Sequence, residues 1–167
     1  MEINSVIKIR GVNPYILVTS DQALRIKSDW KRPIPVAVQI NGKPETPWRI
    51  NMMPAGDGNF YLYLRGEVRK ASGTKVGDQV IARIVFDHEY RNGPQHPMPK
   101  WLSASIEKDQ TAKGNWERLS PARKKEVLRY FANLKSTDAK ERNMKRVLEV
   151  LSGKKGRFLG RTWIDGS

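Results

Sequence analysis

The sequence predicts a β-barrel followed by a small helical module. First, residues 59–86 combine a strand, a short helix, a tight turn and a second strand in one compact unit. Second, a weaker copy of this pattern begins at Tyr15, about 45 residues earlier, and two copies of a half-barrel predict a pseudo-symmetric barrel within one chain. Third, beyond a proline-rich linker at residues 91–98 the apolar period changes from two to 3.6 residues, as in helices.

Alternating apolar residues define the strands of the barrel. Ile3, Ser5, Ile7 and Ile9 share one side of a first strand, and residues 35–40 form a later one after a basic turn. Between them, the run that begins at Tyr15 leads from a strand into a short helix. Period two indicates strands with one buried face.

The clearest hairpin runs from Trp48 to Leu64, because residues 53–59 contain glycines that can adopt positive φ in a turn. A short helix follows at residues 66–72 and ends at Gly73. The predicted core consists of the residues that share the inner face of these strands: Trp48, Ile50, Met52, Phe60, Leu62, Leu64, Val80, Ala82, Ile84 and Phe86.

The outer face of the same strands is not cleanly polar. Tyr61 and Tyr63 point outward in this register beside Arg49, as do Ile81 and Val85. An apolar outer face indicates a covering element, for which the C-terminal helices, a second copy of the chain and a ligand are candidates. We therefore assign Tyr61, Tyr63 and Arg49 to an interaction face.

The helical module is expected at residues 99–153. Pro99 opens a first helix, and a break near Gly114 precedes a weak helical turn at residues 115–119. Ser120 and Pro121 supply an N-cap and a first-turn proline for the next helix, and Ser136 or Thr137 caps the last one. The expected organisation is a barrel domain at 1–90, the linker at 91–98, the helical module at 99–153 and a basic, fraying tail at 154–167.

Composition limits the possible chemistry. The chain of 167 residues has no cysteine, which excludes disulfides and thiolate chemistry and fits a reducing cytoplasm. Neither a signal peptide nor a membrane-spanning run is evident, so we expect a cytoplasmic protein without membrane insertion. His88 and His96 are the only histidines and lack the spacing of helical metal ligands. We expect no metal, no cofactor and, since no catalytic motif is present, no enzymatic activity.

The strongest compositional signal is a formal charge of +14, which attracts polyanions. Residues 1–91 hold 14 basic against 9 acidic side chains, and residues 92–167 hold 17 against 8. Nucleic acid and acidic proteins are therefore the expected partners. The candidate polyanion-binding residues lie on the short helix at 66–72 or just before it, and on the helix that follows Ser120: Arg65, Arg69, Lys70, Arg123, Lys124, Lys125 and Arg129.

Two resemblances cover most of the chain. The motifs Phe60-x-Leu62-x-Leu64, Glu67 to Ala71, and Lys75-Val-Gly-Asp78-x-Val80 resemble the unit of AbrB/MazE-type double-split β-barrels. With both halves in one chain, the sequence is similar to single-chain relatives of that fold in a bacterial family of unknown function. AbrB-like DNA binders have an arginine where this chain has Gly58-Asn59, and they assemble from two chains, so the resemblance implies the fold more than operator binding.

The second resemblance lies in the helical module. The run from Trp116 to Pro121, residues 130–135, and Arg142-Asn-x-x-Arg146 followed by Gly153 are similar to the YdeI or OmpD-associated module. The family label of bacteriocin protection implies an association with envelope stress and implies no reaction.

Two functions follow from these observations. The first is a non-enzymatic binding protein that holds a polyanion, most directly nucleic acid, on basic helical faces. The alternative is a stress-associated, bacteriocin-protection-type scaffold that docks a protein on the outer aromatic face of the barrel. An enzyme would need a pocket with convergent polar groups and a perturbed carboxylate such as Asp78 or Asp87.

Overall fold

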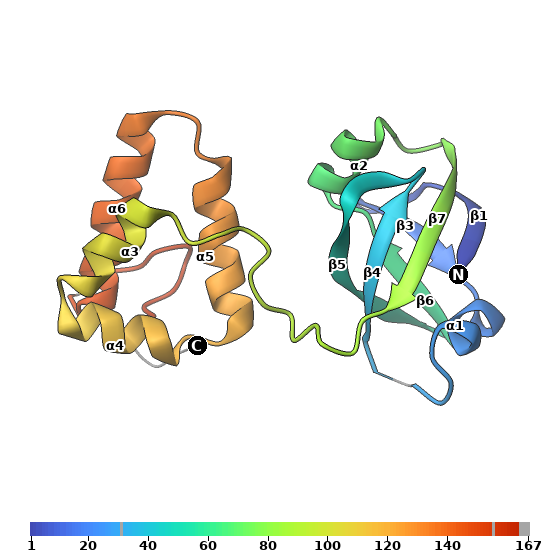
Figure 1. Ribbon diagram of the computed structural model, residues 1–167, viewed down its shortest axis with the longest axis horizontal. Helices are drawn as coiled ribbons and strands as arrows, with labels where there is room; N and C mark the ends of the chain where they lie inside the picture. Colours follow the sequence, from blue (N-terminus) through green and yellow to red (C-terminus); the bar gives the residue numbers. More distant parts are fainter. Residues whose placement is uncertain (31, 155, 164–167) are drawn as a thin grey trace. The chain divides into compact units, whose positions relative to one another are not determined.

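A computed structural model describes residues 1–30, 32–154 and 156–163. The chain forms two compact units, Met1–Arg91 and Asn92–Ser167, so the division falls at the start of the predicted linker. Each unit has its own buried apolar cluster. We call them the barrel unit and the helical unit, and Figure 1 shows the strands in the first and the long helices in the second.

The barrel unit is a curled antiparallel sheet of seven strands in the order β1-β7-β4-β5-β6-β3-β2 (Figure 1). The strands are β1 (Glu2–Val6), β2 (Lys8–Arg10), β3 (Asn13–Val18), β4 (Ile34–Ile40), β5 (Lys43–Gly56), β6 (Asn59–Tyr63) and β7 (Gln79–Phe86). Two short helices, α1 (Ser20–Ile26) and α2 (Gly66–Ser72), connect β3 to β4 and β6 to β7. This confirms a barrel-like β unit followed by helices.

The inner face of the sheet carries the predicted core. Ile34, Met52 and Leu62 are completely inaccessible to solvent, and Ile16 is inaccessible beside them on β3. Trp48, Ile50 and Phe86 are only partly buried and pack against the cluster from its margin. Alternation therefore predicted the face of each residue correctly, although Trp48 and Ile50 in the middle of β5 and Phe86 at the end of β7 remain partly exposed.

Local turn chemistry fixes the hairpin between β5 and β6. Asp57 and Gly58 form its tip, with φ of 48° and 81°, and Gly56 has a φ of 98°. Helix α2 ends, as predicted, at Gly73, whose φ is 65°. Positive φ costs little for glycine because it has no Cβ, so these positions allow the chain to reverse within a few residues.

The helical unit contains α3 (Lys100–Glu107), α4 (Gln110–Arg118), α5 (Pro121–Asn133) and α6 (Thr137–Leu151). Ser120 and Ser136 cap α5 and α6, each accepting a hydrogen bond from a backbone N–H three residues later. The predicted break near Gly114 is wrong, because α4 runs through this residue. Its N-cap is Asp109, which accepts a hydrogen bond from the Ala112 N–H.

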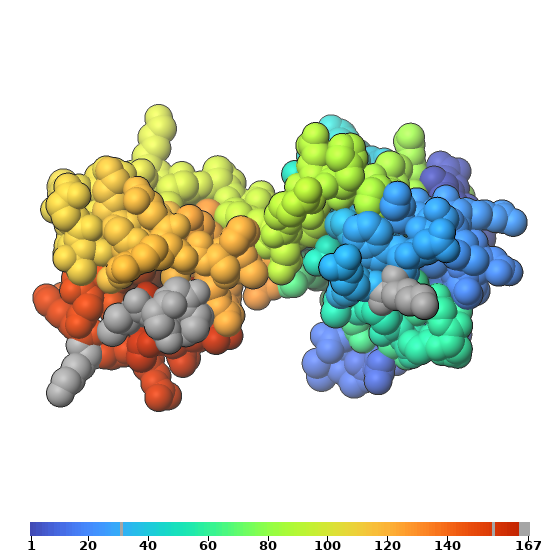
Figure 2. All heavy atoms as spheres, turned by 90° about the horizontal axis from the view of Figure 1, so that it is seen from below, coloured from blue at the N-terminus to red at the C-terminus, as the bar shows by residue number. Residues whose placement is uncertain are grey.

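The segment after α6 also differs from the predicted fraying tail. Phe158 and Trp163 are 2% and 0% exposed, and Phe158 pairs with Arg161 in an antiparallel bridge. Phe158 stacks on Phe131 of α5 with 5.9 Å between ring centroids. In Figure 2, the red segment that includes α6 lies against the yellow and orange segments of the other helices. Aromatic burial therefore holds residues 156–163 in the helical unit, whereas residues 155 and 164–167 lie outside the described part.

Candidate functional site

Three tyrosines form a cluster on the outer face of the barrel unit. Strands β3 and β6 pair so that Tyr15 lies opposite Tyr63 and Leu17 opposite Tyr61. The ring centroid of Tyr15 lies 5.0 Å from that of Tyr61 and 6.2 Å from that of Tyr63, and the centroids of Tyr61 and Tyr63 are 5.7 Å apart. All three side chains are partly exposed. We call Tyr15, Tyr61 and Tyr63 the tyrosine face.

Basic side chains border the tyrosine face. The Arg10 guanidinium carbon lies 4.8 Å from the centroid of the Tyr61 ring, within the range of a cation–π contact. Lys8 lies opposite Tyr15 in the pairing of β2 with β3, so it projects from the same face. The sequences of β2, β3 and β6 contain no aspartate or glutamate. The tyrosine face is therefore aromatic and positively charged.

The sequence predicted only part of this arrangement. It assigned Tyr61 and Tyr63 to the outer face but missed Tyr15, Lys8 and Arg10. Both tyrosines of β6 lie within one alternating run, whereas their neighbours come from strands about 45 residues earlier in the chain. The alternation of Lys8 with Arg10 was the available signal, and strand pairing was needed to use it.

Arg49, the third predicted member of the interaction face, is held within the barrel unit. Its Nε and Nη2 donate to the two carboxylate oxygens of Asp87 at 2.6 and 2.8 Å, and its guanidinium carbon lies 5.3 Å from the ring centroid of Tyr90. The Asp87 carboxylate also accepts the backbone N–H groups of Glu89 and Tyr90. Arg49 thus ties β5 to the turn after β7.

The ion pair makes stability depend on pH. The hydrogen bond from Arg49 lowers the pKa of Asp87 below its usual value, against the opposing effect of burial. Because the carboxylate is more acidic in the folded chain, its contribution is complete above the unfolded pKa of about 3.9 and is lost as the pH falls through the folded value. We expect Asp87→Asn to destabilise the barrel unit at pH 7, and the difference from wild type to shrink below about pH 4. Urea unfolding at several pH values measures this, and a difference that stays constant down to pH 2.5 would contradict it.

The cations around α2 are dispersed. Arg65 is the N-cap residue and Arg69 donates from Nε to the Leu64 carbonyl at 3.3 Å, whereas Lys70 is exposed. Arg65 follows Tyr63 by two residues in extended backbone, with φ of −63° and ψ of 158°. Arg65 therefore extends the basic border of the tyrosine face along β6, while Arg69 supports α2.

Helix α5 carries four cations and a single carboxylate. Glu126 is the only acidic residue of α5, and its Oε2 lies 3.4 Å from Arg123 Nη1 and 3.8 Å from Arg161 Nε. Lys124 donates to the Glu117 carbonyl at 3.1 Å, and Lys125 donates to the Asn92 side chain. The group we call the α5 basic strip comprises these four cations and Arg129: Arg123, Lys124, Lys125, Arg129 and Arg161. Two of the five cations, Arg123 and Arg161, pair with Glu126, and Arg161 is an addition that only the fold reveals.

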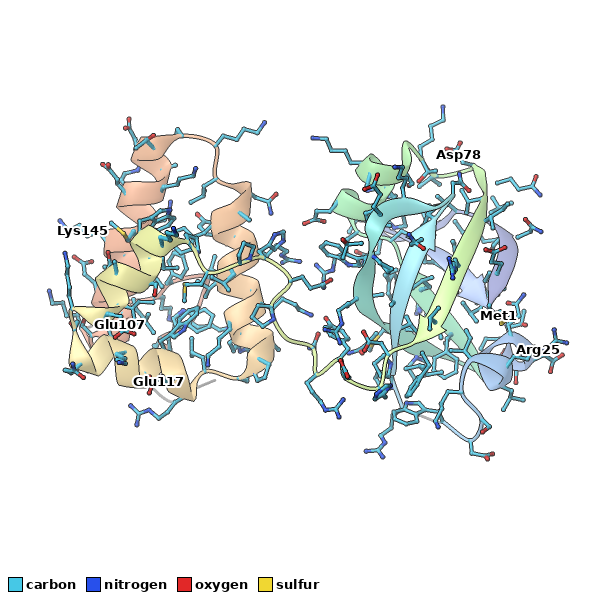
Figure 3. The ribbon with its side chains drawn as sticks, viewed as in Figure 1. Met1, Arg25, Asp78, Glu107, Glu117 and Lys145 are labelled. Atoms are coloured by element: carbon cyan, nitrogen blue, oxygen red, sulfur yellow. The ribbon has the colours of Figure 1, made fainter. Side chains whose placement is uncertain are left out.

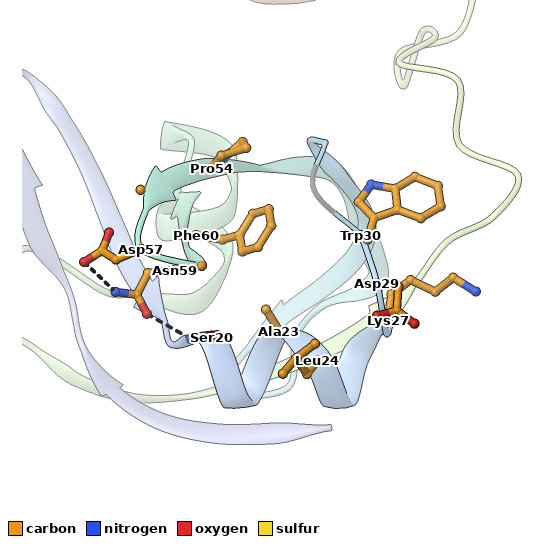
Figure 4. Close-up of a pocket in the computed structure, with 12 residues that line it drawn as sticks. Ser20, Ala23, Leu24, Lys27, Asp29, Trp30, Pro54, Asp57, Asn59 and Phe60 are labelled. Atoms are coloured by element: carbon orange, nitrogen blue, oxygen red, sulfur yellow. Dashed lines mark hydrogen bonds between the residues drawn. The ribbon is translucent and has the colours of Figure 1, made fainter.

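A pocket of about 380 Å³ lies between α1 and the β5–β6 hairpin tip. Figure 4 shows Ala23 and Leu24 of α1 facing the hairpin residues Pro54 and Phe60 across it, with Trp30 to one side. Asn59 Oδ1 accepts the Ser20 N–H at 2.9 Å and so joins the tip to α1. The Gly-Asp-Gly segment at the rim acts as the turn that the sequence predicted.

Neither carboxylate that the sequence offered for catalysis lines this pocket. Asp78 accepts the Lys75 N–H at 2.8 Å in the turn before β7, and Asp87 is the partner of Arg49. Across the described ranges 1–30, 32–154 and 156–163, no group of three or more histidine, aspartate or glutamate side chains is placed to hold a metal ion. Both aspartates have structural contacts that account for their positions.

Comparison with known proteins identifies two matched regions. Residues 6–84 match the family model Domain of unknown function (DUF1905), and residues 96–153 match the model Bacteriocin-protection, YdeI or OmpD-Associated. No curated protein matches the chain significantly. None of the helices in the described part of the chain has the length and apolar character to span a membrane. The barrel unit is thus similar to DUF1905 domains and the helical unit to YdeI or OmpD-associated domains, and the second of these similarities agrees with the resemblance seen in the sequence.

Proposed function

We propose that this protein is a non-enzymatic cytoplasmic protein that binds nucleic acid as a polyanion through the α5 basic strip. The observation that carries the proposal is the sharing of Glu126 between Arg123 and Arg161, which leaves the strip with an excess of positive charge. Clustered cations on a rigid helix can replace the counterions that phosphates otherwise condense. Release of those counterions favours binding at low salt.

The other basic helix provides a contrast. Helix α6 carries Lys140, Arg142, Lys145 and Arg146, but Asp138, Glu141 and Glu149 are interspersed among them. Figure 3 shows Lys145 on the side of α6 away from α5. The interspersed acidic side chains of α6 offset the attraction of its basic side chains for a polyanion. We therefore assign polyanion binding to α5.

Charge reversal with a matched control tests the proposal. Against mixed-sequence DNA and RNA in 50 mM salt, Lys124→Glu/Lys125→Glu/Arg129→Glu is expected to lose at least about tenfold in affinity, and the logarithmic salt slope should become shallower by about two units. Lys140→Glu/Lys145→Glu/Arg146→Glu makes the same change in net charge on α6 and should have a clearly smaller effect. Fluorescence anisotropy measures both quantities.

Two outcomes count against this function. Equal losses for the two triple variants would show that net charge alone matters and would remove the α5 assignment. Failure of the wild-type chain to bind either nucleic acid at low salt would reject nucleic-acid binding altogether. Circular dichroism at 222 nm verifies that both variants retain their helices.

We further propose that the barrel unit is a double-split, pseudo-symmetric barrel of the AbrB/MazE type. The run β3-α1-β4 and the run β6-α2-β7 each place a seven-residue helix between two strands. This repetition supports two related halves in one chain. It supplies a framework on which β2, β3 and β6 lie side by side.

A stress-associated scaffold of the bacteriocin-protection type is the second candidate function. It is favoured by Ile81 and Val85, which are each 49% exposed on the outer face of β7. Exposed apolar side chains on a regular strand are typical of protein contacts. Ile81→Ser/Val85→Ser should then abolish recovery of a specific protein partner while leaving nucleic-acid binding unchanged.

A further inference from the structure

We propose that the tyrosine face stacks the bases of single-stranded nucleic acid, which makes a single strand, rather than a duplex, the preferred ligand of the barrel unit. This inference rests on the proposed nucleic-acid-binding function and adds a second, chemically different surface to it. The relevant residues are the three tyrosines and the cations that border them.

The rings are available to a ligand because the core is complete without them. Ile16 and Leu62 alternate with the tyrosines along β3 and β6 and are completely buried on the inner face. The three rings therefore lie on the opposite face, where they contact one another edge to face or tilted. Their hydroxyl groups make no hydrogen bond with another residue in the described part of the chain. The cluster is thus a partly exposed aromatic surface whose contacts include the Arg10 guanidinium over Tyr61 and the rings themselves.

The positive charges around the tyrosine rings indicate which kind of ligand this face binds. Lys8 and Arg10 border the tyrosine face on β2, and Arg65 follows Tyr63 at the end of β6, with no carboxylate in these three strands. A second copy of this chain docked face to face would bring like charges together. A single-stranded nucleic acid instead offers aromatic bases for the rings and phosphates for the cations. The surface therefore complements nucleic acid in both respects.

Base pairing determines whether the bases of a nucleic acid can stack on the tyrosine face. In a duplex the flat faces of the bases are covered by their stacked neighbours, so they cannot stack on protein rings. In an unpaired strand each base has a free face, and stacking on aromatic side chains tolerates any sequence. The tyrosine face should therefore favour single strands without a strong sequence preference.

Aromatic replacement separates stacking from charge. We expect Tyr15→Leu/Tyr61→Leu in the full chain to weaken binding of a fluorescein-labelled oligo-dT by at least about tenfold, the loss typical of one or two stacked bases. Binding of a labelled duplex of equal length should change less than about twofold. Tyr15→Phe/Tyr61→Phe keeps the rings and should bind oligo-dT like the wild type. Ile81→Ser, on the outer face of β7, is the control for a general change in surface apolarity.

Ultraviolet crosslinking locates the contact independently of affinity. Crosslinks from oligo-dT are expected on peptides that contain Tyr15, Tyr61 or Tyr63, as identified by mass spectrometry. Retention of oligo-dT affinity by the leucine variant together with crosslinks confined to the helical unit would overturn the inference. So would an equal loss of single-strand and duplex binding in that variant.

The outcomes also distinguish this inference from the function on which it rests. If the wild type binds single strand and duplex equally and only the α5 variant is impaired, the proposed function stands and the stacking inference fails. If the wild type binds neither, both fail. Capture of a protein by the wild type but not by the leucine variant, with no oligo-dT binding, would assign the tyrosine face to a protein partner and reject the inference.

Discussion

Trp163→Ala should destabilise the helical unit by about 3–5 kcal/mol, the usual cost of removing a large buried aromatic side chain. Trp163 is completely inaccessible to solvent, and its Nε1 donates to the Phe158 carbonyl. The substitution would leave a cavity beside Phe158 and remove this buried hydrogen bond. Because Phe158 stacks on Phe131 of α5, the loss should reach the packing of the helix itself. Thermal unfolding followed at 222 nm measures the change.

A second tryptophan supplies the control. Trp101 on α3 also contacts Phe131, with 5.2 Å between ring centroids, but it is 36% exposed. Trp101→Ala should therefore cost clearly less, because solvent can occupy part of the vacated space. The barrel unit has a separate apolar cluster, so its unfolding should change little in either variant. A loss below about 1 kcal/mol for Trp163→Ala, or one no larger than for Trp101→Ala, would show that residues 156–163 do not hold the unit together.

Gly58→Ala is expected to destabilise the barrel unit by about 2–3 kcal/mol, combining backbone strain with a steric clash. Gly58 has a φ of 81°, and an added Cβ would lie 2.7 Å from Ser20 Oγ and 3.1 Å from Ser20 Cβ. The hairpin tip would have to move away from α1. That movement would weaken the hydrogen bond from the Ser20 N–H to Asn59 Oδ1. Urea unfolding monitored by near-ultraviolet circular dichroism measures the loss.

A substitution at Gly42 serves as a control that measures backbone strain without a steric clash. It lies in the turn between β4 and β5 with a φ of 76°, and no heavy atom lies within 4 Å of a Cβ added there. Gly42→Ala should therefore cost only the left-handed conformation, about 1 kcal/mol. Equal losses at Gly58 and Gly42 would mean that the approach of the tip to α1 contributes nothing. Partial rescue of Gly58→Ala by Ser20→Gly would establish the clash directly.

The predictable parts of the fold are those in which neighbouring residues determine conformation. Alternation placed Phe60, Leu62 and Leu64 on the inner face, and Gly73 marked the end of α2. Ser120 with Pro121 marked the start of α5 in the same way. In each case the relevant information lies within about one turn of helix or one hairpin, where side-chain preference and backbone geometry agree.

The sequence-based predictions were wrong or incomplete where the conformation of a segment depends on contacts with distant parts of the chain. Glycine suggested a break at Gly114, yet Asp109 caps the helix and Ala112 is completely buried in it, so packing outweighs propensity. Phe158 and Trp163 follow no periodic pattern, and their burial depends on partners far away in the chain. The tyrosine face has the same origin, since its rings come from two strands that only sheet pairing brings together.

The strand order of the barrel unit has a consequence for folding. The first strand, β1, pairs with the last, β7, and the Met1 ammonium donates to the Ile84 carbonyl at 2.9 Å. Closing a loop of this length costs entropy before any contact across it can form. During synthesis on a ribosome, β1 therefore remains without its pairing partner until β7 has left the exit tunnel. The helical unit is built from helices joined by short turns, so we expect its helices to form rapidly once released and the packing of Phe158 and Trp163 to complete the unit last.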